Sequence, residues 1–139
     1  ATTANPVLKN DKLNAVYQHY IHLTTALTNG DVAEAKIAAN AIEAGSKSIN
    51  GASGIASSAE KIMAAPDMAA QRTSYSGMSK DIAELIKKEG LSGGELYVAF
   101  CPMALNDKGA TWISGSREIR NPYFGEKMLG CGEVKETIK

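Results

Sequence analysis

The stretch that decides the fold runs from residue 11 to residue 34 and has the sequence DKLNAVYQHYIHLTTALTNGDVAE. Its apolar side chains recur at steps of three and four residues, as on one face of a helix. They are Leu13, Val16, Tyr17, Tyr20, Leu23 and Leu27. Asn29-Gly30 then predicts a helix end, because glycine accepts the left-handed backbone of a helix stop. Asp31 follows as a predicted N-cap, with Glu34 in capping-box position. The stretch therefore predicts a helix, a tight turn and the start of a second helix.

The helical pattern continues to Gly90. The second helix is rich in alanine, which favours helix and permits close approach of a neighbour, and Asn50-Gly51 marks its end. A third helix is expected over residues 53–63, and a fourth from Pro66 to the glycine stop. Short connections leave each helix to pack beside the next one. We therefore expect a mainly α fold, with an antiparallel four-helix up-and-down bundle over residues 11–90.

A tail of different composition follows the helices. Leu96–Phe100 and Thr111–Ile113 are β-prone runs separated by a turn-rich stretch, so a short β-hairpin is expected. Trp112 is expected to anchor this tail on the bundle. We predict a single domain over residues 1–139, in which the hairpin and loops of residues 91–139 pack on the helices.

Charge and hydropathy exclude several kinds of partner. The 139 residues carry 15 basic and 15 acidic side chains, so the formal net charge is zero. This balance argues against a nucleic-acid partner and against an electrostatic membrane anchor, because both depend on clustered Lys and Arg. No run of about 18 apolar residues is present, so membrane insertion is not expected. Ala1–Pro6 have neither a basic start nor an apolar stretch, and any signal peptide is expected to have been removed.

The sequence also lacks the motifs of common enzyme classes. It contains no Gly-rich phosphate loop, and Gly51-Ala52-Ser53-Gly54 does not match a nucleophile elbow. A cysteine–histidine nucleophile would require a cysteine close to His19 or His22. The pattern gives no reason to expect that proximity, so the protein is predicted not to be an enzyme.

Sulfur is concentrated in the tail, in two clusters. The first is Cys101-Pro102-Met103, and the second is Met128-Leu129-Gly130-Cys131. A turn at the proline can direct the first two sulfur atoms toward one point, and a three-residue step in a helical or turn conformation does the same for the second pair. If the clusters meet, two thiolates and two thioethers converge, and ligands this soft select Cu(I) above other metal ions.

Other interpretations of the same residues remain open. Cys101 and Cys131 could instead form a disulfide that closes a loop of about 30 residues and stabilises the fold by roughly 3 kcal/mol. His19 and His22 are three residues apart and could share a metal ion, but the helical pattern favours a solvated pair. We keep His19 as a candidate additional ligand. Met103 and Met128 could also be core residues.

The tail resembles a known bacterial family. The resemblance is carried by LYVAFCPMA at residues 96–104, GATWIS at residues 109–114 and IRNPYFGEKMLGCGEV at residues 119–134. It extends to residues 20–41 and to the region around Arg72. The family is a domain of unknown function in exported proteins, which occurs alone and at the C-terminus of periplasmic adaptor (membrane fusion) subunits of copper/silver-type heavy-metal efflux systems.

The resemblance implies metal handling outside the cytoplasm. Positions that match its Cys-Pro-Met and Met-x-x-Cys-Gly elements are the metal ligands selected above: Cys101, Met103, Met128 and Cys131. Asn121, Pro122 and Tyr123 match a turn expected to be structural. We therefore expect a periplasmic or secreted protein that binds Cu(I), or Ag(I), and passes it to an efflux adaptor. The alternative is a structural or interaction module with a Cys101–Cys131 disulfide.

Overall fold

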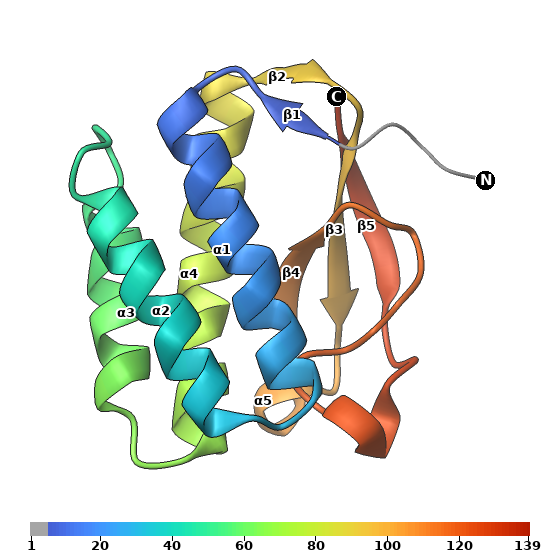
Figure 1. The fold of residues 1–139 in the computed structure, drawn as a ribbon. Helices are drawn as coiled ribbons and strands as arrows, with labels where there is room; N and C mark the ends of the chain where they lie inside the picture. The colour runs from blue at the N-terminus through green and yellow to red at the C-terminus, as the bar shows by residue number, and fades with distance from the viewer. Residues whose placement is uncertain (1–5) are drawn as a thin grey trace.

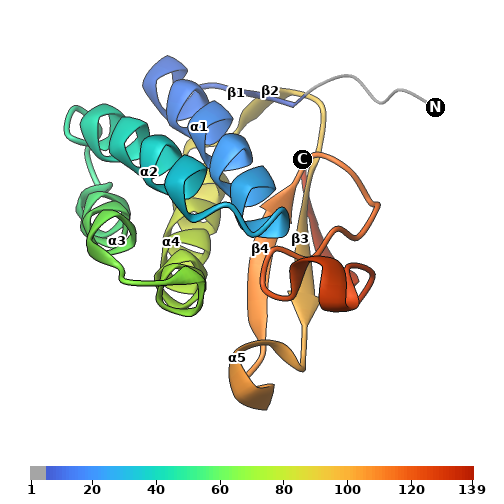
Figure 2. The ribbon, with the colours of Figure 1, turned by 60° about the horizontal axis from the view of Figure 1, so that its bottom comes forward.

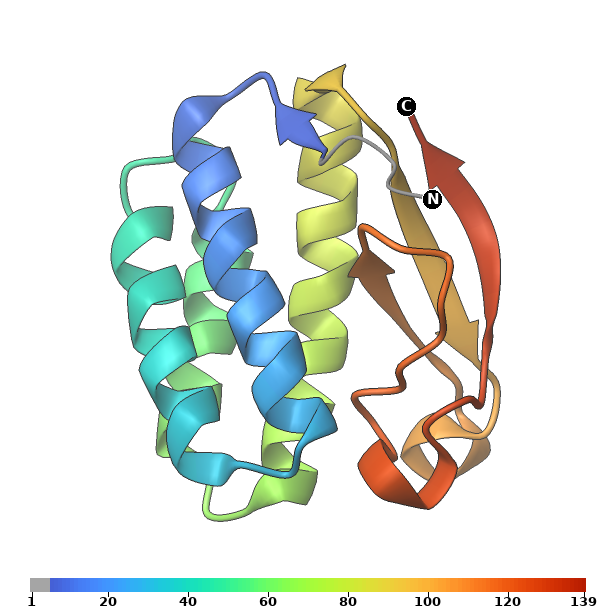
Figure 3. The ribbon, with the colours of Figure 1, turned by 45° about the vertical axis from the view of Figure 1, so that its right-hand side comes forward.

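The structure, a computed structural model, describes residues 6–139 and consists of a helical layer beside a β-sheet. Figure 1 shows the long helices on one side and the sheet on the other, and Figure 3 shows the two layers in profile. The expectations for Ala1–Asn5 lie outside the described residues. In the part described, no helix combines the length and apolar character needed to cross a bilayer.

The helical layer is formed by α1 (Asp11–Thr28), α2 (Val32–Ser46), α3 (Ser53–Ala64) and α4 (Met68–Glu89). These bounds lie within a few residues of those the apolar pattern predicts, so the mainly helical character is confirmed. Each helix packs against the next one along the chain, and Figure 2 shows that α1 and α4 lie nearest the sheet. Gly90 ends α4 with φ of 85°, the left-handed backbone that glycine adopts without strain.

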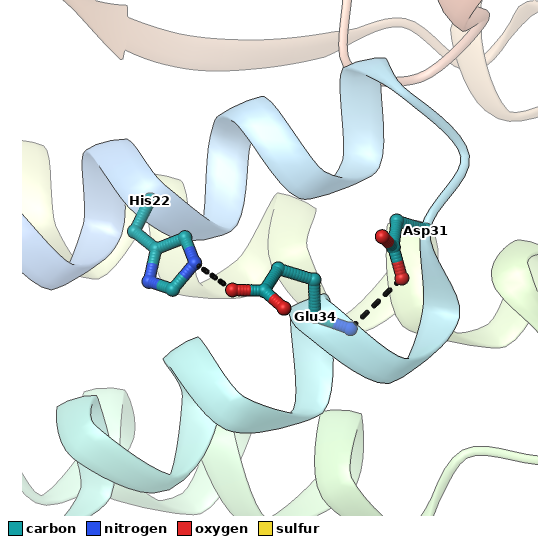
Figure 4. Close-up of polar contacts among 3 residues, drawn as sticks. All are labelled: His22, Asp31 and Glu34. Carbon is teal, nitrogen blue, oxygen red and sulfur yellow. Dashed lines mark hydrogen bonds and ion pairs between the residues drawn. The ribbon is translucent and has the colours of Figure 1, made fainter.

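The turn between α1 and α2 is organised by the predicted cap, but not as a full capping box. The carboxylate of Asp31 accepts a hydrogen bond from the Glu34 N–H at 3.0 Å. In a capping box the Glu34 side chain would reach back to the Asp31 N–H. That N–H instead donates to the Ala26 carbonyl at 2.8 Å, and the Glu34 carboxylate lies 2.6 Å from Nε2 of His22 (Figure 4). Glu34 therefore joins the two helices.

The sheet contains the expected hairpin and one further strand. β3 (Leu96–Cys101) and β4 (Ala110–Ser114) pair antiparallel, with Ala99 opposite Trp112. β5 (Glu133–Ile138) pairs antiparallel with the other edge of β3, which gives the strand order β4-β3-β5. The hairpin is thus confirmed, whereas the third strand was not predicted.

Short elements complete the fold. β1 (Val7–Leu8) pairs with β2 (Leu91–Gly93), so the start of the described chain lies beside the end of α4. A single turn, α5 (Ala104–Asp107), connects β3 to β4, and the 3-10 turn η1 (Gly125–Met128) precedes β5. None of these was predicted.

One hydrophobic core runs through both layers. Trp112 is 2 % exposed and packs edge-on against Tyr123, with ring centroids 6.0 Å apart. The aromatic series continues from Tyr123 to Tyr75 of α4 at 5.5 Å, and then to Tyr20 of α1 at 5.3 Å. Stacked and tilted aromatic rings therefore join the sheet to the two nearest helices.

The outer edge of β4 is covered by tyrosine hydroxyl groups rather than by another strand. The Ile113 N–H donates to the Tyr20 hydroxyl at 3.0 Å, and that hydroxyl lies 2.8 Å from Oγ of Ser79. The Tyr123 hydroxyl donates to the Thr111 carbonyl at 2.6 Å. Because β4 is an edge strand, these contacts satisfy backbone groups that lack a strand partner.

Candidate functional site

The two cysteines meet at one end of the sheet, although they are 30 residues apart in the sequence. Their sulfur atoms lie 2.8 Å apart, and both cysteines are free thiols. Cys101 is the last residue of β3 and is completely buried. Cys131 lies in the loop between η1 and β5 and is partly exposed. The fold thus presents a pair of thiols, one of them open to solvent.

Gly132 permits this approach of the two cysteines. Its φ is +137°, a backbone conformation that other residues rarely adopt. A Cβ atom at this position would lie 3.0 Å from the Phe100 carbonyl oxygen and 3.1 Å from the Trp112 ring. Glycine therefore lets the loop that carries Cys131 run close to the end of β3.

Asn121 holds the Cys131 loop from inside the protein. Its side chain is fully buried, and its amide nitrogen donates to the Cys131 carbonyl at 2.8 Å. Its amide oxygen accepts hydrogen bonds from the N–H groups of Tyr123 at 2.7 Å and Phe124 at 3.1 Å. The Asn121 N–H donates to the Leu129 carbonyl at 2.8 Å. One side chain therefore fixes both arms of the loop.

Arg72 of α4 attaches the same loop to the helical layer. Its Nε donates to the Pro122 carbonyl at 2.7 Å, and one terminal nitrogen donates to the Leu27 carbonyl at 2.8 Å. Burial lowers the pKa of this guanidinium. Close packing extends to Gly125, where a Cβ would lie 2.8 Å from the Thr28 carbonyl oxygen. Arg72 was not predicted as a site residue, because its backbone acceptors leave no pattern in a sequence.

The residues predicted as structural support all lie at this junction. Asn121, Pro122 and Tyr123 are buried in the loop, and Trp112 lies beneath Gly132. They connect the Cys131 segment to β4 and α4 through the contacts described above. Their placement explains how a loop with little regular structure keeps a defined path.

The two methionines predicted as metal ligands differ from the cysteines in the contacts that they make. Met103 is 47 % exposed, in the turn after β3. Met128 is partly buried at the end of η1, and its carbonyl accepts a hydrogen bond from the Cys131 N–H at 3.1 Å. Over residues 6–139 neither cysteine thiol forms a hydrogen bond with a methionine sulfur. The cysteines are therefore the centre of the site.

His19 does not join the cysteines in a larger donor group. It lies partly buried within α1, and His22, one turn later, pairs with Glu34. Among the described residues there is no group of three or more His, Cys, Asp or Glu side chains arranged to hold a metal ion.

The hydrogen bond between the thiols has an electrostatic consequence. It raises the pKa of the Cys131 thiol, because loss of the Cys131 proton would remove the hydrogen bond with Cys101, and desolvation and the charge of a neighbouring Cys101 thiolate add to the effect. A metal ion bound here would have to displace protons, so its affinity would fall as the pH falls.

The sulfur separation has to change for the thiols to share a metal ion. Metal–thiolate bonds of about 2.3 Å at a tetrahedral angle place two sulfur atoms about 3.8 Å apart. The present contact of 2.8 Å is shorter. It is also longer than the S–S bond of about 2.05 Å in a disulfide. The donor chemistry fits a soft ion, and binding requires the loop to open by about 1 Å.

A separate cleft of about 500 Å³ opens between α1 and the loop after β4. Tyr17, Ile21 and Arg120 are among its lining residues. The Tyr17 hydroxyl is buried and has no hydrogen-bond partner in the described part of the chain. Unlike the Tyr20 hydroxyl one turn later, it therefore forms no polar contact with β4.

Fold and site together define a mainly helical protein with a small antiparallel sheet and a thiol pair at one end of that sheet. A family model described as "Protein of unknown function (DUF3347)" matches residues 16–94, and the chain belongs to this family. The match covers the helical layer from Val16 onward and ends before the thiol pair. Searches of curated proteins and of solved structures found no match.

Proposed function

We propose that this protein binds a soft monovalent metal ion, Cu(I) or Ag(I), through the thiolates of Cys101 and Cys131. The observation that carries the proposal is the meeting of two thiols from distant parts of the chain, one buried and one partly exposed. Two thiolates offer the soft ligands that Cu(I) prefers. The partly exposed sulfur gives an ion a route in and out by ligand exchange.

The two sides of the pair would contribute differently to binding. Cys101 is fixed by strand pairing with Ala110, whereas Cys131 lies in a loop held by Asn121. Widening of the sulfur separation would therefore come from the loop. Met128 lies in the turn that enters this loop, and Met103 lies two residues after Cys101. Both are proposed thioether ligands that a small loop movement would recruit.

The family resemblance supplies the proposed setting. We place the protein in the periplasm or among secreted proteins, where it would hold copper or pass it to an adaptor subunit of a heavy-metal efflux system. It would act as a binding protein rather than as an enzyme, with no nucleic-acid partner. Its residues would form a single domain in which α1–α4 are an antiparallel up-and-down bundle.

The same contact favours a second candidate function. At 2.8 Å the sulfur atoms need to approach by less than about 1 Å to form a disulfide. In that case the protein would be a structural or interaction module stabilised by the disulfide. The two sulfur atoms would then not be available as metal ligands.

An anaerobic Cu(I) titration of the reduced protein against a chromophoric chelator separates these functions. The proposal expects one tightly bound Cu(I) per chain. Binding should be lost in Cys101→Ser and Cys131→Ser and weakened in Met128→Leu and Met103→Leu. Met63→Leu, a methionine of α3 packed against the core, is the matched control and should bind as the wild type does. If the folded wild-type protein fails to compete with the chelator, the copper function is wrong.

A further inference from the structure

The two thiols differ sharply in their access to solvent. Cys101 has no exposed surface and sits at the end of the central strand. Cys131 is partly exposed in a loop. Thiol–disulfide exchange requires direct attack of a thiolate on a disulfide sulfur atom, so it depends on access as well as on thiolate character. A disulfide-bearing reactant can therefore reach Cys131 but not Cys101.

We propose that the pair is a redox switch with a fixed order of reaction, in which Cys131 reacts first and Cys101 closes the bond. In the first step the Cys131 thiolate attacks a reactant disulfide such as glutathione disulfide. A mixed disulfide forms at Cys131, and one glutathione thiolate leaves. In the second step the Cys101 thiolate attacks Sγ of Cys131 and the second glutathione thiolate leaves. The protein loses two electrons and two protons, and glutathione disulfide is reduced to two thiols.

The surroundings of the pair favour the second step. The sulfur atoms already lie 2.8 Å apart, so closure needs no rearrangement of the fold. Asn121 holds the Cys131 carbonyl from the side of the protein interior, and Gly132 keeps the loop against β3 and Trp112. A mixed disulfide at Cys131 is thus formed within reach of the buried thiol, which makes it short-lived.

The consequence for metal binding rests on the function proposed above. A disulfide leaves neither sulfur atom as a thiolate, so oxidation would release a bound soft ion and reduction would restore the site. The pair would then bind metal only under reducing conditions.

Reaction of the reduced, metal-free protein with glutathione disulfide, followed by acid quenching and mass spectrometry, tests the order. Cys101→Ser should accumulate a stable glutathione adduct at Cys131. The matched variant Cys131→Ser should form its adduct at Cys101, and the rate should be lower by about tenfold or more. The wild type should pass to the internal disulfide without accumulating adduct. Equal rates in the two variants, or a persistent adduct in the wild type, would overturn the proposal.

A second measurement needs no variant and so does not depend on variant folding. Limiting alkylation of the reduced wild-type protein, followed by peptide mapping, should label Cys131 before Cys101. Labelling of Cys101 first, or of both together, contradicts the order. A Cu(I) titration of the oxidised protein should then show no binding, with recovery after reduction, and equal binding in both states would overturn the switch. If the reduced protein binds no Cu(I), the metal function fails while the exchange order stands on its own result.

Discussion

The helical layer and the tail of residues 91–139 are stabilised in different ways. The helical layer is held mainly by buried apolar side chains between helices that follow one another in the chain, and those of α2 include Ala35, Ala38, Ala39 and Ile42. The tail depends on side chains that bind backbone groups, above all Asn121, Tyr123 and Arg72. Asn121 and Tyr123 belong to the tail itself, whereas Arg72 comes from α4 of the helical layer. The geometry of the thiol site is therefore set by contacts within the tail together with one attachment from the helical layer.

Alkaline pH should break the junction between the two regions. Tyr17, Tyr20, Tyr75 and Tyr123 lie at this junction, and burial raises the pKa of each hydroxyl above its usual value. With the hydroxyls protonated, the fold keeps its full stability below the unfolded tyrosine pKa of about 10. That stability is lost as the pH rises toward the pKa values of the folded protein. We expect cooperative unfolding above about pH 10. Circular dichroism and tyrosinate absorbance measure it. Ionisation of all the tyrosines near pH 10 in a protein that stays folded would contradict this.

Trp112→Ala should cost about 3–5 kcal/mol of unfolding free energy, because it removes the large side chain that packs the tail on the core. Denaturant titration measures the loss. Ile37→Ala, at a position of α2 that is 59 % exposed, serves as the control and should change stability by less than about 0.5 kcal/mol. Similar losses in both variants would mean that the tail does not depend on its tryptophan.

Asn121→Ala should cost about 2–3 kcal/mol, since it leaves buried backbone groups of the loop without partners. It should also lower the effective concentration of Cys131 at Cys101, measured as the equilibrium of their disulfide against glutathione. The control is Asn40→Ala on the exposed face of α2, which should have no effect on the thiol pair. An unchanged equilibrium in Asn121→Ala would show that the loop is held by other contacts.

Two tyrosines one turn apart provide a matched pair. Tyr20→Phe removes a hydroxyl that bonds with Ile113 and lies against Ser79, and should cost about 1–2 kcal/mol. Tyr17→Phe removes a buried hydroxyl with no partner, and should leave stability unchanged or slightly higher. Thermal unfolding of both variants makes the comparison. A larger loss in Tyr17→Phe would reverse the roles assigned to these hydroxyls.

The smallest effect is expected within the helical layer. His22 and Glu34 are 41 % and 45 % exposed in their side chains, and pairs so exposed contribute less than about 1 kcal/mol. Glu34→Gln should therefore reduce stability by only a few tenths of a kcal/mol, measured by chemical denaturation at low salt. A loss as large as that of Tyr20→Phe would show that the helical layer also depends on polar contacts.

The same contrast explains which elements the sequence could predict. Helices α1–α4 follow from local apolar periodicity and from stop signals such as Gly90, and their observed bounds agree closely. β3 and β4 follow from β-prone runs. β5 was missed because three of its six side chains are charged and exposed, and β1 because two residues carry no pattern.

The site was only partly accessible to sequence reasoning. The pattern of sulfur residues singled out Cys101 and Cys131, and the structure brings their sulfur atoms together. The dependence of that contact on Arg72 could not be foreseen, because its acceptors are carbonyl groups of Pro122 and Leu27. The capping-box interpretation of Glu34 failed for a related reason, since His22 of the preceding helix competes for the carboxylate.

The hydroxyl groups along the outer edge of β4 have a consequence for the behaviour of this protein in concentrated solution. An open strand edge is a template on which a second chain can add a strand and begin aggregation. Tyr20 and Tyr123 occupy backbone groups that such a strand would need. At the opposite edge of the sheet, β5 carries Glu133, Lys135 and Glu136 on its exposed positions, and edge charges repel strand addition. The hydroxyl contacts along β4, one of which joins the sheet to α1, thus also help to keep one copy of the chain from pairing with the next.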